Sequence, residues 1–493
     1  METTHAQAPE RALDFRGLER PNPSLLSTAS RLISAHPWLW LSVLIGVCLL
    51  PFVNKAFFTD DTLFLRAAEQ IQKHPLDFYG FKINWFGYSS TMSAAFENPP
   101  LTSYYIAFVA SWVGWSEPAL HLAFLLPALA AAWGIFNLAR LHCERPLLAA
   151  TIAVLTPAFL VCATAVMCDI MLLALWVWCI VLFEHGLTTG ERRAFLLSGV
   201  LGGLAFLTKF PGLSLVPLLG AYGLMRRRTL GWWMLAPTVP LLFVAGYECL
   251  TYFLYGHGHL FASADYASDF RTYAHDPLWE KVTIGFAFLG GCFLPMFFFG
   301  PLLWSRRFFL GGLCGLAACL LFVPRMSAWT TFLWKSGGML DIPMFLFISS
   351  LVVCGASVFV LAVLDAWEKR DASSVLFLLW IGGVFVFTTA VNWTVNGRSL
   401  LPAVPALGIL IARRLKRTRP GEVQVLPLRL VLPGIASAAT ALLLARSDVN
   451  LANTERTAAV QIFQAAHSGS NTVWFRGHSG YQYYFENLGA RAL

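Results

Sequence analysis

Apolar segments separated by short polar intervals follow one another from Trp38 to Ala445. Their length, about 17 to 25 residues, is what a helix needs to cross a bilayer. The segments lie near residues 37–56, 99–115, 118–140, 147–167, 169–184, 194–208, 211–225, 231–255, 281–304, 308–323, 340–364, 374–391, 399–412 and 425–445. The pattern predicts an all-α polytopic membrane bundle with about thirteen spanning helices, at roughly 20 residues for each span.

Composition and charge support the same class of protein. The 493 residues are 57% hydrophobic and 13% charged, whereas soluble domains carry about 25% charged residues. Much of the net charge of +8 lies in short clusters between apolar segments, at Arg226–Arg228, Arg306–Arg307 and Arg413–Arg419. Clusters of this kind mark cytoplasmic loops. We therefore interpret them as topology signals and expect no nucleic-acid partner.

The basic clusters assign each polar interval to a side of the membrane. With the clusters inside, residues 57–98, 256–280 and 446–493 fall outside, and residues 1–35 form a cytoplasmic tail before an uncleaved anchor. The first half does not alternate consistently, because an even number of segments precedes the interval 256–280. We expect one short segment between residues 99 and 225 to be re-entrant, interfacial or merged with its neighbour.

Acidic residues stand at the edges of several apolar segments. Asp60 and Asp61 follow the first segment, Glu97 precedes the second, and Asp169 joins two apolar runs. A carboxylate beside hydrocarbon is costly unless it faces water, a partner or a substrate. Helix capping is the alternative for the three aspartates, because Asp is a good N-cap residue. The functional interpretation is a general base or a metal-orienting carboxylate, since removing the proton of a hydroxyl acceptor needs a positioned base.

Three cations lie on the same inferred outer face. Lys209 and Arg398 interrupt apolar stretches, and Arg271 lies in the second outer interval, residues 256–280. One interpretation is snorkelling, in which a long side chain carries its charge to the membrane interface. The other is phosphate binding, for which Arg offers a planar fork and Lys a point charge.

The signals for a metal site are weaker. His257 and His259 form an H-x-H pair in the second outer interval, followed by His275. They leave a divalent metal ion as a weak cofactor candidate, and a cap over the site is the preferred interpretation of this interval. The ten cysteines lie mostly in apolar segments and form no C-x-x-C pair. Neither a disulfide framework nor a zinc site is indicated.

Acids and phosphate-binding cations on one face of a membrane bundle suggest a particular reaction. A lipid-phosphate donor lies along the helices, its phosphate is held by Lys and Arg, and Asp60 activates an acceptor hydroxyl. The cations also stabilise the charge that develops on the leaving phosphate, which is usually a large catalytic contribution.

Five motifs carry a family resemblance. They are Thr59-Asp60-Asp61, Glu97-Asn98-Pro99-Pro100, Asp169, Leu207-Thr208-Lys209 and Arg398-x-x-Leu401-Pro402. In this order they resemble the GT-C membrane glycosyltransferases, in particular the bacterial branch with protein O-mannosyltransferases and the aminoarabinose transferases of lipid A. The resemblance runs from about Trp38 to Ala412, and it is the order of the motifs that raises it above chance.

The resemblance implies a substrate class and a membrane. The donor would be a polyprenyl-phosphate-linked monosaccharide, transferred with inversion to a lipid, glycan or protein acceptor. The enzyme would lie among the lipids of the cell inner membrane, with its active site facing the periplasm or exterior. The resemblance implies that Asp60 is the base or an acceptor-orienting carboxylate, with Asp61 and Asp169 as supporting acids. It implies that Glu97 is a site carboxylate and that Lys209 and Arg398 bind the donor phosphate.

The chain departs from the family in two places. The aminoarabinose transferases have a lysine where this chain has Asn98, and many family members carry a large periplasmic C-terminal domain. Here residues 36–445 form the expected transmembrane transferase domain, and residues 446–493 are only a short outer tail. The acceptor is therefore not identified by the resemblance.

Two other functions stay open at this point. A transporter or flippase of lipid-linked sugars typically has charges near the bilayer midplane and internal repeats, whereas this chain has its acids at one face and shows no repeat. A glycan ligase or polymerase would use a lipid-diphosphate donor, so the type of donor distinguishes it from the leading hypothesis.

Overall fold

The computed structural model describes residues 35–85, 87–274, 277–329, 333–335, 338–415, 428–467 and 472–493. Residues 1–34, His275 and residues 416–419, to which the topology and site predictions also referred, lie outside the described residues. The helices of the first half are α2 (Pro37–Leu49), α3 (Asp61–Lys73), α4 (Met92–Ala95), α5 (Leu101–Val113), α6 (Glu117–His142), α7 (Pro146–Val154), α8 (Pro157–Ala163), α9 (Cys168–Thr189), α10 (Arg192–Thr208), α11 (Leu215–Arg227) and α12 (Leu235–Tyr255). Those of the second half are α13 (His259–Ala274), α14 (Leu278–Cys292), α15 (Pro295–Phe298), α16 (Gly300–Leu303), α17 (Arg306–Ala318), α19 (Ile342–Lys369), α20 (Ala372–Val386), α21 (Val404–Arg414), α22 (Leu428–Ala466) and α23 (Ser479–Asn487).

Short elements complete the described chain. The 3₁₀ helices are η1 (Leu50–Phe52), η2 (Phe210–Ser214), η3 (Trp232–Met234), η4 (Cys319–Leu321), η5 (Val323–Arg325), η6 (Ser327–Trp329) and η8 (Arg398–Ala403), and η7 (Phe387–Val391) is a π-helix. Strands β1 (Lys82–Asn84) and β2 (Ser89–Thr91) pair antiparallel, with Ile83 opposite Ser90. Strands β3 (Trp474–Phe475) and β4 (Arg491–Ala492) pair in parallel, with Trp474 opposite Arg491.

The all-α polytopic membrane fold is confirmed. Within the described residues, 7 helices are long and apolar enough to cross a membrane, or up to 8 if one bent pair counts as a single span. Helices α5 and α11 also correspond to predicted apolar segments, but each has 13 residues, shorter than a bilayer normally requires. The number of about thirteen spans, at roughly 20 residues each, therefore stays a prediction.

The bent pair of helices, α7 and α8, lies in the part of the chain where the predicted alternation between the two sides of the membrane was inconsistent. Helices α7 and α8 meet at an angle of 61°. Leu155 and Thr156 separate them, and the side-chain oxygen of Thr156 accepts a hydrogen bond from Phe159 N at 3.2 Å, which caps the start of α8. Pro157 at the first helical position supplies no N–H, so it suits a helix start and cannot continue the preceding ladder. The broken segment thus falls within the predicted interval, residues 99–225.

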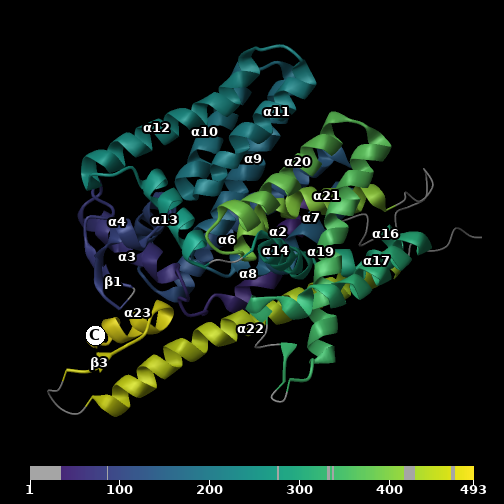
Figure 1. The fold of residues 1–493 in the computed structure, drawn as a ribbon. Helices are drawn as coiled ribbons and strands as arrows, with labels where there is room; N and C mark the ends of the chain where they lie inside the picture. The colour runs from purple at the N-terminus through teal and green to yellow at the C-terminus, as the bar shows by residue number, and fades with distance from the viewer. Residues whose placement is uncertain are drawn as a thin grey trace, which may run out of the picture.

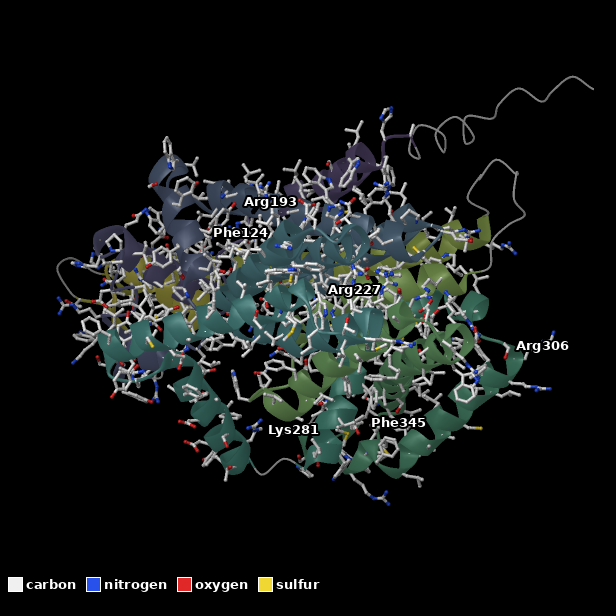
Figure 2. The ribbon with its side chains drawn as sticks, turned by 90° about the horizontal axis from the view of Figure 1, so that it is seen from above. Phe124, Arg193, Arg227, Lys281, Arg306 and Phe345 are labelled. Atoms are coloured by element: carbon white, nitrogen blue, oxygen red, sulfur yellow. The ribbon has the colours of Figure 1, made fainter. Side chains whose placement is uncertain are left out.

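Close helix packing at one crossing depends on glycine. Helices α14 and α19 pack against each other, and Gly290 and Gly355 meet at the crossing. A Cβ on Gly355 would lie 2.0 Å from the carbonyl oxygen of Phe286, so only glycine allows this approach. Small residues serve in this way at many membrane helix interfaces. The basic clusters Arg226–Arg228 and Arg306–Arg307 are exposed, and Figure 2 shows Arg306 at the outer edge of the molecule. Arg413 differs, because its side chain is buried and pairs with Asp365 and Asp371.

The first predicted outer interval has a helical structure of its own. Helix α3 packs against α5, and its buried face includes Leu63, Phe64 and Ile71. Helix α22 runs without a break from the last apolar segment to Ala466. The predicted boundary at residue 446 is therefore a change of polarity within one helix. The chain then turns back, and α23 lies beside α3 (Figure 1).

Candidate active site

The turn before α3 presents Asp60. Thr59 has φ of +47°, an uncommon value for a β-branched residue and therefore a point of local strain. Asp60 occupies the N-cap position of α3, but its side chain makes no capping hydrogen bond. Instead, its Oδ2 accepts from Arg398 Nη2 at 2.8 Å. The Asp60 side chain therefore does not cap α3, which was the alternative explanation for this aspartate.

Asp61 has a different environment. Its side chain is 1% exposed. One carboxylate oxygen accepts from Phe58 N at 2.9 Å and the other from Val166 N at 3.1 Å. These bonds tie the turn to the connection between α8 and α9. Asp61 thus supports the backbone beside Asp60 and does not line the cavity into which Asp60 projects.

A second acid–cation pair stands next to the first. Asp169 lies in the first turn of α9, where the helix dipole favours a negative charge. Its Oδ1 lies 2.6 Å from Lys209 Nζ, and the two side chains are 3% and 17% exposed. Lys209 follows the last residue of α10 in an extended conformation, which ends that helix. The structure therefore pairs Lys209 with Asp169 and Arg398 with Asp60, residues that the sequence had only placed on one face.

A polar cavity of about 460 Å³ collects most of the predicted residues. Asp60, Glu97, Lys209, Arg271 and Arg398 all line it. Sequence reasoning missed polar and aromatic side chains that line it as well: Trp85, Asn392, Trp393, Asn396 and Ser399. The polar turn at residues 392–398 between two apolar segments was the available signal for three of them.

Glu97 is a partly buried carboxyl group in this cavity. Burial, and to a lesser extent the negative charge of Asp60, raises the pKa of Glu97 to about 7. The turn that carries it is held on both sides. His259 Nε2 donates to Phe96 O at 2.7 Å, and the hydroxyl of Tyr79 donates to Asn98 O at 2.6 Å. A rigid turn therefore fixes the position of a carboxyl group that is partly protonated near neutral pH.

The histidines proposed as metal ligands do not converge. His259 is buried, and its Nδ1 lies 2.6 Å from the hydroxyl of Tyr247, so both ring nitrogens are engaged. His257 Nδ1 lies 3.0 Å from the carbonyl oxygen of Tyr255. Across the described ranges, no group of three or more His, Cys, Asp or Glu side chains is arranged to hold a metal ion. His259 instead positions the Glu97 turn.

Helix α13 lies along the cavity, and its role as a cap stays a prediction. Leu260, Ser263 and Tyr266 of this helix line the cavity. Arg271 lines it too, but its Nη1 donates to the carbonyl oxygens of Ala390 and Val391, the first at 2.7 Å. Arg271 therefore links α13 to the end of η7 in addition to bringing a positive charge to the cavity.

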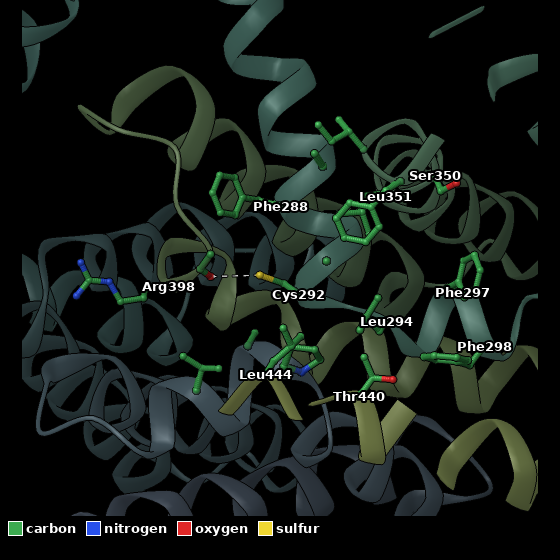
Figure 3. A pocket seen from close by; sticks show the side chains of 18 of the residues that line it. Phe288, Cys292, Leu294, Phe297, Phe298, Ser350, Leu351, Arg398, Thr440 and Leu444 are labelled. Atoms are coloured by element: carbon green, nitrogen blue, oxygen red, sulfur yellow. Dashed lines mark hydrogen bonds between the residues drawn. The ribbon is translucent and has the colours of Figure 1, made fainter. Parts of the chain in front are cut away.

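An apolar cavity of about 950 Å³ adjoins the polar one. Its lining includes Phe288, Phe297, Leu351 and Leu444, from α14, α15, α19 and α22. Arg398 lines both cavities. Figure 3 shows its guanidinium group directed away from the apolar side chains. A long apolar chain and a charged head group would thus fit on the two sides of one arginine.

The structure thus brings a charged cavity and an apolar cavity together within a helical membrane bundle. Residues 97–246 match the family of dolichyl-phosphate-mannose-protein mannosyltransferases. Over these residues the chain is similar to that family, which confirms the predicted resemblance for this part of the sequence. The matched residues include Glu97, Asp169 and Lys209, whereas Asp60 and Arg398 lie outside them.

Solved structures resemble the whole chain in fold. The Archaeoglobus fulgidus oligosaccharyltransferase tethered with an acceptor peptide superposes with a TM-score of 0.54 at 13% identity, covering 94% of this chain and 64% of that one. Its apo form gives 0.52 at 15% identity, covering 93% and 64%. ArnT from Cupriavidus metallidurans in the apo state gives 0.45 at 15% identity, covering 92% and 85%. This chain thus spans about two thirds of the archaeal enzyme, and the likeness is one of fold. No curated protein matches it in sequence.

The Asp169–Lys209 pair gives a stability prediction. Asp169→Asn leaves the ammonium group of Lys209 largely buried without its charge partner, which costs about 3 to 5 kcal/mol of unfolding free energy. In Asp169→Asn/Lys209→Met neither charge is buried, so the loss should be smaller. Denaturant unfolding of the purified protein in detergent measures both variants. A double variant that is no more stable than Asp169→Asn would contradict the pairing.

Proposed function

We propose that this protein transfers a monosaccharide from a polyprenyl-phosphate donor to a hydroxyl-bearing acceptor at the outer face of the cell inner membrane, with inversion. One observation carries the proposal. Arg398 lies between the apolar cavity and the polar cavity and is paired with Asp60. A lipid phosphate at this arginine would place its sugar beside the carboxylate. The family match supports the donor class, since its description names a dolichyl-phosphate sugar.

The donor phosphate can bind without breaking the Asp60 ion pair. Arg398 Nη2 donates a hydrogen bond to Asp60 Oδ2, whereas Nη1 donates to the sulfur of Met167. A thioether is a weak acceptor, so a phosphate oxygen readily replaces it. Charge-assisted hydrogen bonds from guanidinium to phosphate are among the stronger ones in proteins. Lys209, which also lines the polar cavity, supplies a second positive charge. The prenyl chain then occupies the apolar cavity.

The transfer step uses Asp60 as the base. The acceptor hydroxyl gives its proton to the carboxylate of Asp60 while its oxygen attacks the anomeric carbon of the sugar. The bond between that carbon and the phosphate oxygen breaks, and its electron pair leaves with the phosphate. Arg398 and Lys209 stabilise the charge that develops there. The products are the glycosylated acceptor and free polyprenyl phosphate. Attack from the side opposite to the phosphate inverts the anomeric centre.

The location of the charges supports the transferase over a transporter. Asp60, Lys209 and Arg398 all lie at helix ends or in turns and line one cavity. Transporters commonly hold their substrates near the bilayer midplane between broken helices. The proposed domain scheme keeps residues 36–445 as the transferase domain with about thirteen spans, from the 20-residue criterion. A ligase that uses a lipid-diphosphate donor is distinguished by assaying both donor types.

The base assignment is tested by Asp60→Asn. Asparagine keeps the shape of the side chain but cannot take the acceptor's proton, and the loss of a general base costs about 10² to 10⁴ in rate. We expect turnover to collapse, measured as release of polyprenyl phosphate from a panel of polyprenyl-phosphate sugars, while donor binding persists. Asp265→Asn, at an exposed position of α13, is the matched control and should leave turnover unchanged. An active, well-folded Asp60→Asn protein would show that Asp60 is scaffold.

The raised pKa of Glu97 leads to a prediction of how donor affinity depends on pH. The pKa of Glu97 is raised to about 7, so the group is mostly neutral at pH 6 and mostly charged at pH 8. A charged Glu97 repels the donor phosphodiester, whose own charge is constant over this range. Donor dissociation constants should therefore rise from pH 6 to pH 8 in the wild type. They should stay nearly level in Glu97→Gln, and an equal rise in both proteins would refute this role.

The orientation of the chain is tested by cysteine labelling. Ser89 and Ser268 are exposed residues of the two intervals proposed to lie outside, and Thr229 follows the basic cluster proposed to lie inside. Each is replaced by cysteine and treated with a membrane-impermeant thiol reagent in intact spheroplasts. We expect Ser89→Cys and Ser268→Cys to react, and Thr229→Cys to react only after the cells are opened. The reverse pattern would place the proposed site in the cytoplasm.

A further inference from the structure

The chain segment that leads to Asp60 is held by side chains from three helices. The amide N–H of Ala56 donates to Asn453 Oδ1 of α22 at 3.0 Å, and the next, that of Phe57, donates to the hydroxyl of Tyr484 of α23 at 2.9 Å. The third, that of Phe58, donates to Asp61 of α3. Three consecutive backbone donors thus have side-chain acceptors, two of them from the C-terminal segment. These contacts join residues about 400 positions apart in the chain.

Other contacts fix the same segment at close range. Lys55, whose side chain is 2% exposed, pairs with Asp448 of α22, with Nζ 2.5 Å from Oδ2. At Gly480 the backbone of α23 lies so close that a Cβ would be 2.4 Å from the carbonyl oxygen of Phe57. The ring of Tyr483 packs edge-on against the ring of Phe57, with centroids 5.7 Å apart. The C-terminal segment is therefore in direct contact with the backbone just before the turn.

The Tyr484 hydroxyl, which accepts the hydrogen bond from Phe57 N, is itself anchored to the helical bundle. The hydroxyl of Tyr484 donates to Glu117 at the start of α6, and Arg456 of α22 pairs with the same carboxylate. A tyrosine hydroxyl has one donor and two acceptor positions, so it can bond Glu117 and Phe57 at once. Through Tyr484, the segment before Asp60 is connected to α6, α22 and α23 together. Figure 1 shows α23 lying beside α3.

We infer that Asn453 and Tyr484 are positioning residues for the reaction: they hold Ala56 and Phe57 so that Asp60 reaches the acceptor hydroxyl and keeps its ion pair with Arg398. The inference rests on the proposed function of Asp60. It gives the C-terminal segment a role that does not involve contact with the substrate. A misplacement of about 1 Å at a reacting group can cost 100-fold in rate. Asp60 stands three residues beyond Phe57, across a strained Thr59, so loosened anchoring would be felt there.

Tyr484→Phe tests this with a matched control. The change removes one hydroxyl and leaves the buried N–H of Phe57 without an acceptor. We expect kcat to fall about 10- to 100-fold, the range for a slightly misplaced group, while donor affinity stays within about twofold. Tyr481→Phe removes the hydroxyl of a tyrosine on the same helix whose ring packs on Phe475 and Phe485. It should leave kcat unchanged. Equal kcat values in the two variants would overturn the inference.

A double variant separates positioning from general damage. If Tyr484 acts through Asp60, adding Tyr484→Phe to Asp60→Asn should cause no further loss of turnover, since coupled residues are non-additive. If the turnover loss of the double variant equals the product of the losses of the two single variants, Tyr484 supports the fold as a whole. Asn453 supplies a second comparison, because Asn453→Asp keeps the acceptor oxygen and Asn453→Leu removes it. The Asp variant should retain turnover and the Leu variant should lose it.

Hydrogen exchange gives a readout that does not depend on any reaction. Exchange of the amides of residues 56–58 should speed up in Tyr484→Phe and Asn453→Leu, and not in Tyr481→Phe or Asn453→Asp. If no polyprenyl-phosphate sugar is consumed by the wild type, the proposed function fails, and exchange alone decides whether these side chains hold the segment. Unchanged exchange in both Tyr484→Phe and Asn453→Leu would reject the inference in either case.

Discussion

The ion pair between Asp60 and Arg398 is the contact on which the rest of the site depends. It joins the turn before α3 to η8, 338 residues later, at the place where the polar and apolar cavities meet. The two side chains are 37% and 36% exposed, so neither charge is sealed in hydrocarbon and both stay available to a ligand. A fully buried pair would be costly to separate. A fully solvated pair would have little electrostatic effect on a reaction, because water screens it.

Order around this pair comes from backbone donors that are satisfied by side chains. Asp61 takes the N–H groups of Phe58 and Val166, and Asn453 and Tyr484 take those of Ala56 and Phe57. A buried N–H without a partner costs about 1 to 3 kcal/mol, so each acceptor has a definite effect on where the turn lies. The two adjacent aspartates therefore have different roles. Asp61 fixes the backbone, whereas Asp60 faces the cavity.

The sequence predicted those features that follow from the cost of charge near hydrocarbon. Acids and cations at segment edges had to face water, a partner or a substrate, and Asp60, Glu97, Lys209 and Arg398 do line one cavity. The pairing between them was not predictable, because it depends on how distant helices pack. For the same reason the burial of Asp61 and the contacts of Tyr484 were missed. The continuity of α22 beyond residue 446 was missed because hydropathy marks where a helix leaves the membrane and not where it ends.

In the proposed reaction, the charges of the site also set the conditions under which it would accept an anionic donor. Asp60 and Asp169 are each paired with one cation, Arg398 and Lys209, which leaves Arg271 as the additional positive charge among these residues. A donor phosphodiester brings one negative charge, which this surplus matches if Glu97 is neutral. An ionised Glu97 would cancel the surplus before the donor arrived. Under the proposed function, the raised pKa of Glu97, caused mainly by its burial, would therefore link the packing of the Phe96–Asn98 turn to the binding of an anionic lipid. Because His259 and Tyr79 hold that turn in place but line neither cavity, two residues outside the cavity would help to decide whether it accepts the proposed donor.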